Sequence, residues 1–145
     1  MSVALTVAAT TVQVPDHGGL IWPDERGWQD VIQTLTRCFG GQLVAQHSAA
    51  MLGGQPMTLT GGQQWAWCYQ STLDALIALL APASAVAAVT LDDGRQYTAI
   101  ADRTQGPAVQ SYPLPLVADS PLIDRDDNTI HVLESIRLLI LAGPL

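Results

Sequence analysis

Short segments rich in Val and Thr, separated by glycines, make up the first half of the chain. Val3 to Val7 and Thr10 to Val14 are two such segments, and both predict strands. Val31 to Thr36 alternates in polarity, and Leu43 to His47 follows after a Gly-Gly turn, so the pair predicts a β-hairpin. Pro56 to Thr60 predicts one more short strand. Four glycine doublets, eight of the twelve glycines, mark the turns between these pieces: 18–19, 40–41, 53–54 and 61–62.

Helical periodicity occurs once in the chain. Leu73, Leu76, Ile77 and Leu80 follow the i, i+3, i+4, i+7 spacing of one helix face. Extended backward through the aromatic residues, this stripe predicts a helix from Trp65 to Leu80, between a Gly-Gly pair and a proline. A capping pair at positions 71 and 74 would instead start the helix later.

The second half returns to β-type patterns. Val86 to Leu91 and Arg95 to Ile100 flank Asp93-Gly94, which predicts a hairpin with a two-residue type I′ turn. Pro107 to Tyr112 predicts another strand. The run from Thr129 to Leu141 keeps its large apolar residues on one parity, which predicts a long strand buried on one face: Ile130, Val132, Ile136, Leu138 and Ile140.

These elements predict a single domain over residues 1–145 of the α+β class, mostly β. The expected architecture is an antiparallel barrel or sandwich with one flanking helix at about 65–80. Between the last two strands, prolines and four Asp residues accumulate, so residues 113–128 are expected to form an extended acidic loop or arm.

The small number of charged residues narrows the range of functions that the sequence allows. Only 13% of residues are charged, about half the usual fraction, and the net charge is −7. All six basic residues are Arg, which is too few to bind nucleic acid or an anionic membrane, and the absence of Lys excludes a P-loop or a Schiff-base enzyme. So little charge indicates either an unusually apolar surface or a surface that is partly covered by other proteins.

Targeting and cysteine patterns favour a protein of the reducing cytoplasm. Met1 to Thr11 contains no basic residue of the kind that begins a signal peptide, and the apolar run near 76–89 is too short to span a bilayer. Cys38 and Cys68 fit no zinc or redox spacing, so two buried thiols are expected, with one disulfide as the alternative.

No motif predicts a catalytic, cofactor or metal site. His17, His47 and His131 lack a second ligand at helix or strand spacing and are expected to be structural. Asp124, Asp126 and Asn128 imitate the start of a calcium loop, but its required Gly and Glu positions hold Thr129 and Ser135.

The four tryptophans are the other unusual feature, since the chain has a single Phe. Core packing is expected for most of them, with Trp22 and Trp28 bracketing a Pro-Asp-Glu-Arg-Gly segment. Trp65 and Trp67 are two positions apart and cannot share one helix face, so one of them suits a covered interface.

The order of motifs resembles that of small tail proteins of long-tailed bacteriophages and prophages. The resemblance rests on Leu20-Ile21-Trp22-Pro23-Asp24-Glu25, the hairpin, Gly54-Gln55-Pro56-Met57-Thr58-Leu59, the helix and Leu91-Asp92-Asp93-Gly94-Arg95. It covers about residues 20–112 and the final strand, and it points to the tail-tube and distal-tail superfamily.

That resemblance implies a split β-barrel flanked by a helix and a structural role in the virion tail, as tube, distal-tail or baseplate-hub protein. Such proteins form rings, commonly of six copies, that dock to other tail or baseplate proteins after assembly in the host cytoplasm. The acidic charge would suit a lumen that passes DNA. No enzymatic activity, cofactor, metal, membrane or sequence-specific nucleic acid is expected.

Candidate interface residues follow from this reading. Besides the tryptophans at 22, 28 and 67, we select the turn at Asp93 and Gly94 and the long strand at Ile136, Leu138 and Ile140.

Two other functions stay open at this point. One is a small β-barrel module that binds a peptide or small ligand in a Trp-lined cleft. The other is a hydrolase built from His47, Asp24 or Glu25 and a thiol.

Overall fold

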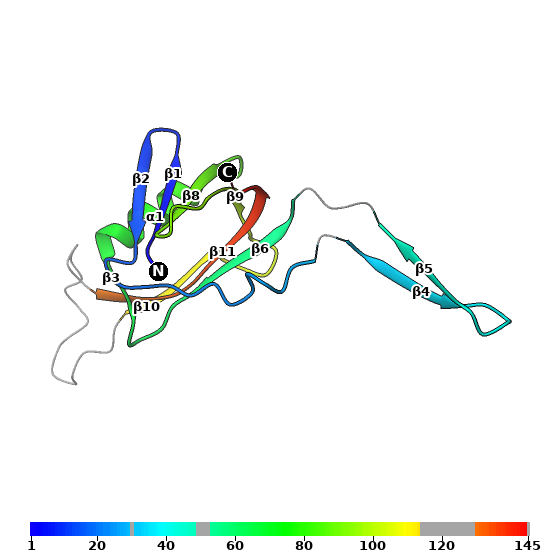
Figure 1. Cartoon of the computed structure of the whole chain (residues 1–145). Helices are drawn as coiled ribbons and strands as arrows, with labels where there is room; N and C mark the ends of the chain where they lie inside the picture. The colour runs from blue at the N-terminus through cyan, green and yellow to red at the C-terminus, as the bar shows by residue number, and fades with distance from the viewer. Residues whose placement is uncertain (30, 49–52, 114–129, 145) are drawn as a thin grey trace.

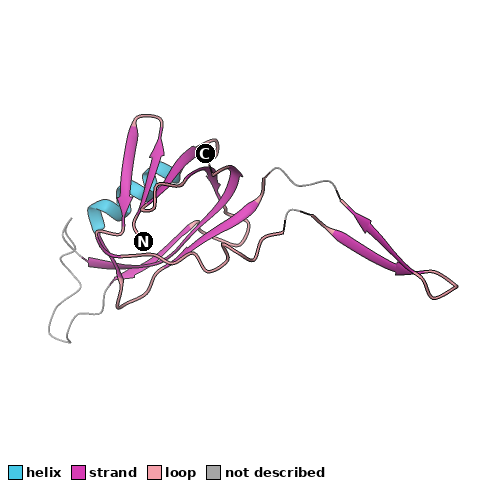
Figure 2. Cartoon of the chain, in the orientation of Figure 1, coloured by secondary structure: helices cyan, strands magenta, loops and turns pink. Residues whose placement is uncertain are grey.

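A computed structural model describes residues 1–29, 31–48, 53–113 and 130–144. It contains a β-rich body with one helix, and a separate two-stranded hairpin that projects from the body (Figures 1 and 2).

The last strand, β11 (Ile130–Ala142), is the spine of the body. On one edge it pairs with β10 (Val109–Pro113) and then β9 (Gln96–Ala101). On the other edge it pairs with β7 (Ala66–Tyr69) and then β6 (Gln55–Thr60), and all four pairings are antiparallel. Figure 1 shows β11 running along the middle of the sheet.

The remaining strands extend this sheet on both sides. β8 (Val86–Leu91) joins β9, followed by β1 (Val3–Val7) and β2 (Thr10–Val14), whereas the two-residue β3 (His17–Gly18) joins β7. The sheet curls into a half-barrel, and α1 (Gln70–Leu80) packs against it, mainly on β2. The sequence-based fold class, mostly β with one flanking helix, is confirmed.

The core lies inside this curl. β1, β6 and β11 contribute alternating side chains that are almost fully buried, and α1 adds Leu73, Leu76, Leu79 and Leu80. The predicted single parity of the last strand is confirmed at Ile136, Leu138 and Ile140. The alternation of buried residues is interrupted near Glu134, which has no paired residue on β10 because a β-bulge shifts the register there.

The predicted helix start is wrong. Residues 66–69 form β7, because Trp67 pairs with β11 and β3 and Cys68 pairs with β11, and the helix begins only at Gln70. Tyr69 occupies the N-cap position in an extended conformation without a side-chain hydrogen bond to the helix. The aromatic spacing of Trp65 and Tyr69 therefore reflected a loop and a strand, not a longer helix face.

The predicted turn type at Asp93-Gly94 is also wrong, although the hairpin itself is present. Only Gly94 has a positive φ (90°), and Gly94 N donates to Leu91 O at 3.0 Å. The connection is thus a three-residue loop, a type I turn followed by a left-handed glycine. Asp93 stabilises it by accepting hydrogen bonds from the backbone N and Nε of Arg95.

The other strand predictions agree with the structure to within two residues at most ends. The exceptions are β3, which no pattern indicated, and the expected acidic segment 113–128, which lies outside the described residues except for Pro113.

Close packing against β11 requires a glycine at position 61. A Cβ there would lie 2.1 Å from Leu133 O and 2.5 Å from Ala66 Cβ. We expect Gly61→Ala to lower the free energy of unfolding by about 2–3 kcal/mol, since overpacking of a rigid core costs that much. Urea unfolding followed by Trp fluorescence measures it. Gly40→Ala is the control, because a Cβ there meets nothing within 4 Å; equal effects of the two changes would contradict the packing.

Candidate interaction surface

The projecting hairpin is formed by β4 (Gln33–Arg37) and β5 (Leu43–His47), and we call residues 31–48 the arm. At its base, Ile32 N donates to Ser48 Oγ and Ser48 N donates to Ile32 O, both at 2.8 Å. At its tip, Gly41 N donates to Cys38 O at 2.9 Å, and Gly41 has a φ of 80°. The tip has the same loop type as the β8–β9 connection, so the hairpin is closed along its whole length.

Every residue of β4 and β5 is exposed, although several of the arm's side chains are large and apolar. The cross-strand register places Leu35, Leu43 and Ala45 on one face together with Arg37. Phe39, the single Phe of the chain, is fully exposed in the tip loop. Five of the large exposed apolar side chains belong to the arm: Ile32, Leu35, Phe39, Leu43 and Val44.

An exposed two-stranded sheet has little intrinsic stability. Isolated hairpins are marginal in water, because they bury too little apolar surface to offset the entropy of ordering the chain. β4 and β5 pair with each other and with no other strand of the described chain. The arm therefore gains stability if its apolar face is covered by another molecule.

The arm also differs from the body in charge. It contains Arg37 and no acidic residue, so all thirteen Asp and Glu residues lie outside it. The guanidinium of Arg37 donates to Gly41 O at 3.3 Å within the arm. An apolar, weakly basic projection and an acidic body are electrostatically complementary surfaces.

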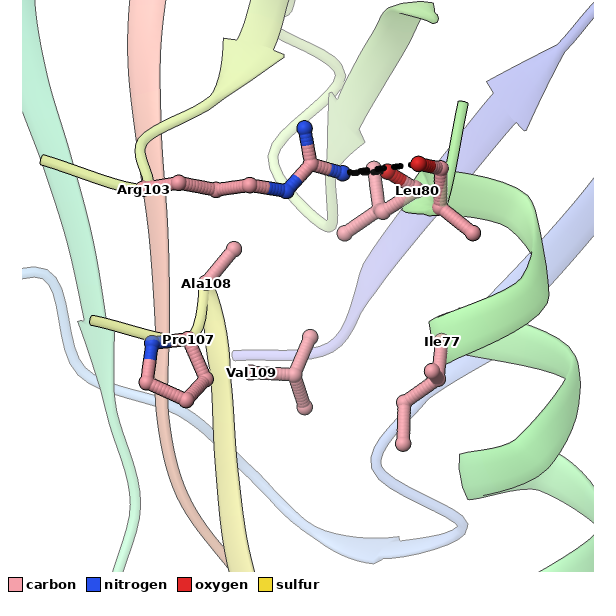
Figure 3. A pocket seen from close by; sticks show the side chains of 7 residues that line it. Ile77, Leu80, Arg103, Pro107, Ala108 and Val109 are labelled. Atoms are coloured by element: carbon pink, nitrogen blue, oxygen red, sulfur yellow. Dashed lines mark hydrogen bonds between the residues drawn. The ribbon is translucent and has the colours of Figure 1, made fainter. Parts of the chain in front are cut away.

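The body carries a pocket between the C-terminal end of α1 and the start of β10, which we call the α1–β10 pocket (Figure 3). Its volume is about 270 Å³. The lining is apolar except for one arginine: Ile77, Leu80, Ala81, Arg103, Pro107, Ala108 and Val109. Ile77 is half exposed at its rim.

Two arginines fix the walls of this pocket. Arg103 Nη2 donates to the carbonyl oxygens of Leu80 and Ala81, so it satisfies acceptors that the end of α1 leaves without partners. Arg137 Nη2 donates to Gln105 O at 3.1 Å and Pro107 O at 2.8 Å, which fixes the loop before β10. Because both walls are tied by hydrogen bonds to backbone, the pocket is preformed.

The tryptophan candidates divide between core and surface. Trp22 is buried and makes an edge-to-face contact with Tyr97, with ring centroids 5.6 Å apart. Trp28 and Trp67 are half buried, and Trp67 Nε1 donates to Gln63 O at 2.5 Å. Trp65 is the most exposed of the four, and its ring packs against Gly62. Trp22 is thus part of the core rather than of a surface.

The other candidate interface residues also divide into exposed and buried positions. Asp93 lies in an exposed turn with Gly94, where it pairs with Arg95, which also binds Glu25. Those hydrogen bonds raise the pKa of Arg95 and lower that of Asp93. In contrast, the selected positions on β11 are buried within their own chain, because β11 has strand neighbours on both edges: Ile136, Leu138 and Ile140.

The residues of the hydrolase hypothesis do not converge. His47 lies on the arm, whereas Asp24 and Glu25 belong to the body, where Asp24 Oδ1 accepts from Thr58 N and Glu25 pairs with Arg95. The two thiols are also separated, and both are free: Cys38 is exposed on the arm, against the expectation of burial, and Cys68 is buried in the body.

Burial raises the pKa of the Cys68 thiol to about 11, so this group stays protonated at neutral pH and is a poor nucleophile. Nearby, His17 Nε2 lies 3.0 Å from Tyr69 Oη, and Asp16 accepts from Tyr69 N. These contacts join β3 to β7.

Neither a metal cluster nor a membrane-spanning helix occurs among the described residues. No three His, Cys, Asp or Glu side chains gather there, and α1 is too short to cross a bilayer. The residues that resemble the start of a calcium loop lie outside the described residues: Asp124, Asp126 and Asn128.

Sequence reasoning missed the exposed arm tip and the pocket arginine. The sequence contained one indication of the exposed tip. Phe39 precedes two glycines in the predicted hairpin turn, where a core residue is not expected. For Arg103 there was no local signal, because its partners on α1 are more than twenty residues away.

Comparisons with protein-family models, curated proteins and solved structures found no match to this chain.

The two thiols predict a labelling pattern. In dilute native protein at pH 8, we expect a maleimide to modify only Cys38, because Cys68 is buried with its pKa raised to about 11. Intact-mass spectrometry should show one label in native protein and two in denaturant. Cys38→Ser is the control and should take no label until the protein unfolds. Rapid labelling of Cys68 in the folded protein would contradict this structure of the body.

Proposed function

We propose that this protein is a structural subunit of the tail of a long-tailed bacteriophage or prophage, and that it acts by assembling into a ring. The observation that carries the proposal is the arm, a hairpin that carries five exposed large apolar side chains and whose strands are exposed along their entire length. Such an element is stabilised by contact with neighbouring subunits.

The body supports the same proposal through its fold. A curled antiparallel sheet with one flanking helix is the architecture that the motif order led us to expect of the tail-tube and distal-tail superfamily. A heterologous contact, in which one surface of a subunit meets a different surface of the next, produces a ring when its rotation closes after a whole number of copies. The arm and the body supply two such different surfaces.

A small-ligand binding module is the second candidate, and the α1–β10 pocket favours it. Its volume of about 270 Å³ lies just below the roughly 300–1,000 Å³ of typical ligand sites. A ligand would thus be about the size of one aromatic group. Calorimetric titration with single-ring aromatic compounds tests this candidate.

The ring proposal predicts that assembly depends on one face of the arm. We expect the wild-type protein to have a multiple of its monomer mass, six copies if the family expectation holds, and Leu35→Gln/Leu43→Gln to be monomeric. Light scattering during size-exclusion chromatography measures the mass. The control is Thr34→Gln/Thr36→Gln, which changes the opposite face of the same hairpin. A wild-type monomer at all concentrations would contradict the proposal.

The tail assignment has a separate test in the phage or prophage that encodes the chain. We expect loss of the gene to leave DNA-filled heads without complete tails in electron micrographs, and complementation to restore them. Normal infectious tails in the deletion strain would contradict a structural role.

A further inference from the structure

One molecule presents both an exposed aromatic knob and a pocket of matching size. Phe39 is fully exposed at the arm tip. The α1–β10 pocket measures about 270 Å³, and a cavity of about 150 Å³ already holds benzene. A phenyl ring therefore fits the pocket with room for part of its backbone.

The chemistry of the pocket suits an aromatic ring. Figure 3 shows Ile77, Pro107 and Val109 around the space below the Arg103 guanidinium. Arg103 Nη2 donates to the carbonyl oxygens of Leu80 and Ala81. Because the N–H groups of a guanidinium lie in its plane, such an arginine can still stack a face on an aromatic ring, a contact that Arg makes readily.

We propose that the α1–β10 pocket of one copy receives Phe39 from the arm of a second copy. This rests on the proposed function, since it names the joint by which neighbouring subunits of the ring meet. The arm projects away from the body that bears the pocket, so its tip does not reach the pocket of its own chain (Figure 1). The contact is heterologous and repeats from copy to copy.

The match between Phe39 and the apolar lining carries the proposal of a second copy, because the charged residue of the pocket is Arg103 and has the same sign as Arg37. All thirteen acidic residues of the chain lie outside the arm, whereas Arg37 lies two residues from Phe39. The net charge of −7 makes two copies repel each other, and the projecting arm brings no acidic residue toward the body of its neighbour.

A mixed crosslinking experiment tests the joint directly. Wild-type protein supplies Cys38 beside Phe39, and a second preparation, Cys38→Ser/Ala81→Cys, supplies its exposed thiol at the pocket while Cys68 stays buried. After mixing and treatment with a short bismaleimide, we expect a peptide that links positions 38 and 81, which forms only between two copies. The control preparation is Cys38→Ser/Gln13→Cys, with its thiol at a different hollow, between β2 and α1.

The outcomes separate this joint from the proposed function. A link to position 81 at least tenfold more abundant than the link to position 13 supports the joint. Assembly by light scattering without that preference overturns the joint and leaves ring assembly intact. Absence of both assembly and crosslink overturns both.

Point variants give an independent measure of the same contact. We expect Phe39→Ala and Ile77→Arg each to weaken self-association about tenfold or more, as loss of a central aromatic anchor does. The double variant should be no weaker than the more affected single one, because both changes remove the same contact. Val86→Arg is the matched control, since Val86 and Ile77 are both 48% exposed. Unchanged association in Ile77→Arg, with normal urea unfolding, overturns the proposed joint.

Discussion

The rest of the body depends on the pairing of β11 along both of its edges. Four strands from different parts of the chain, β6, β7, β9 and β10, hydrogen-bond to this one strand. Such non-local pairing requires that the final segment of the chain be present before the half-barrel closes. It also forces close approaches, of which Gly61 beside Leu133 O is the tightest against the spine. The pocket is a consequence of the same arrangement, because Arg137 on β11 fixes the loop that begins β10.

The arm stands outside this cooperative unit. Its hydrogen bonds run between β4 and β5 and through the turn at its tip, and none of the buried core residues belongs to it. The free energy that orders the arm therefore comes from a different source than the free energy that folds the body. This separation permits substitutions on the arm that leave the body intact. It also explains why an apolar segment can persist in a chain whose own core is complete without it.

Local patterns predicted the strands well and the contacts between distant segments poorly. Composition located β1 and β2, alternation located β4 and a Gly-Gly turn located β5, and each of these strands belongs to a hairpin whose partner is close in sequence. The same kind of reasoning found the single parity of Ile136, Leu138 and Ile140, yet it assigned them to an interface. A period of two shows that a face is buried, but it does not show whether the covering side chains come from the same chain or another. Local patterns also could not predict the hydrogen bonds of Arg103, because its carbonyl partners are distant in sequence. The predicted start of the helix was wrong because Trp65 and Tyr69 happen to have helical spacing.

The acidic residues of the chain are distributed unevenly between the arm and the body. Copies of a chain with a net charge of −7 repel each other, and this repulsion opposes contact between two acidic surfaces. A surface without acidic residues and with exposed apolar area is therefore favoured for the self-association that we propose. Among the described elements, the arm meets both conditions, since its charged residue is Arg37 and its exposed side chains include Leu35, Phe39 and Leu43. Segregation of charge thus favours contact between arm and body over contact between two bodies. A subunit built in this way would associate in one direction, head to tail, as closure of a ring requires.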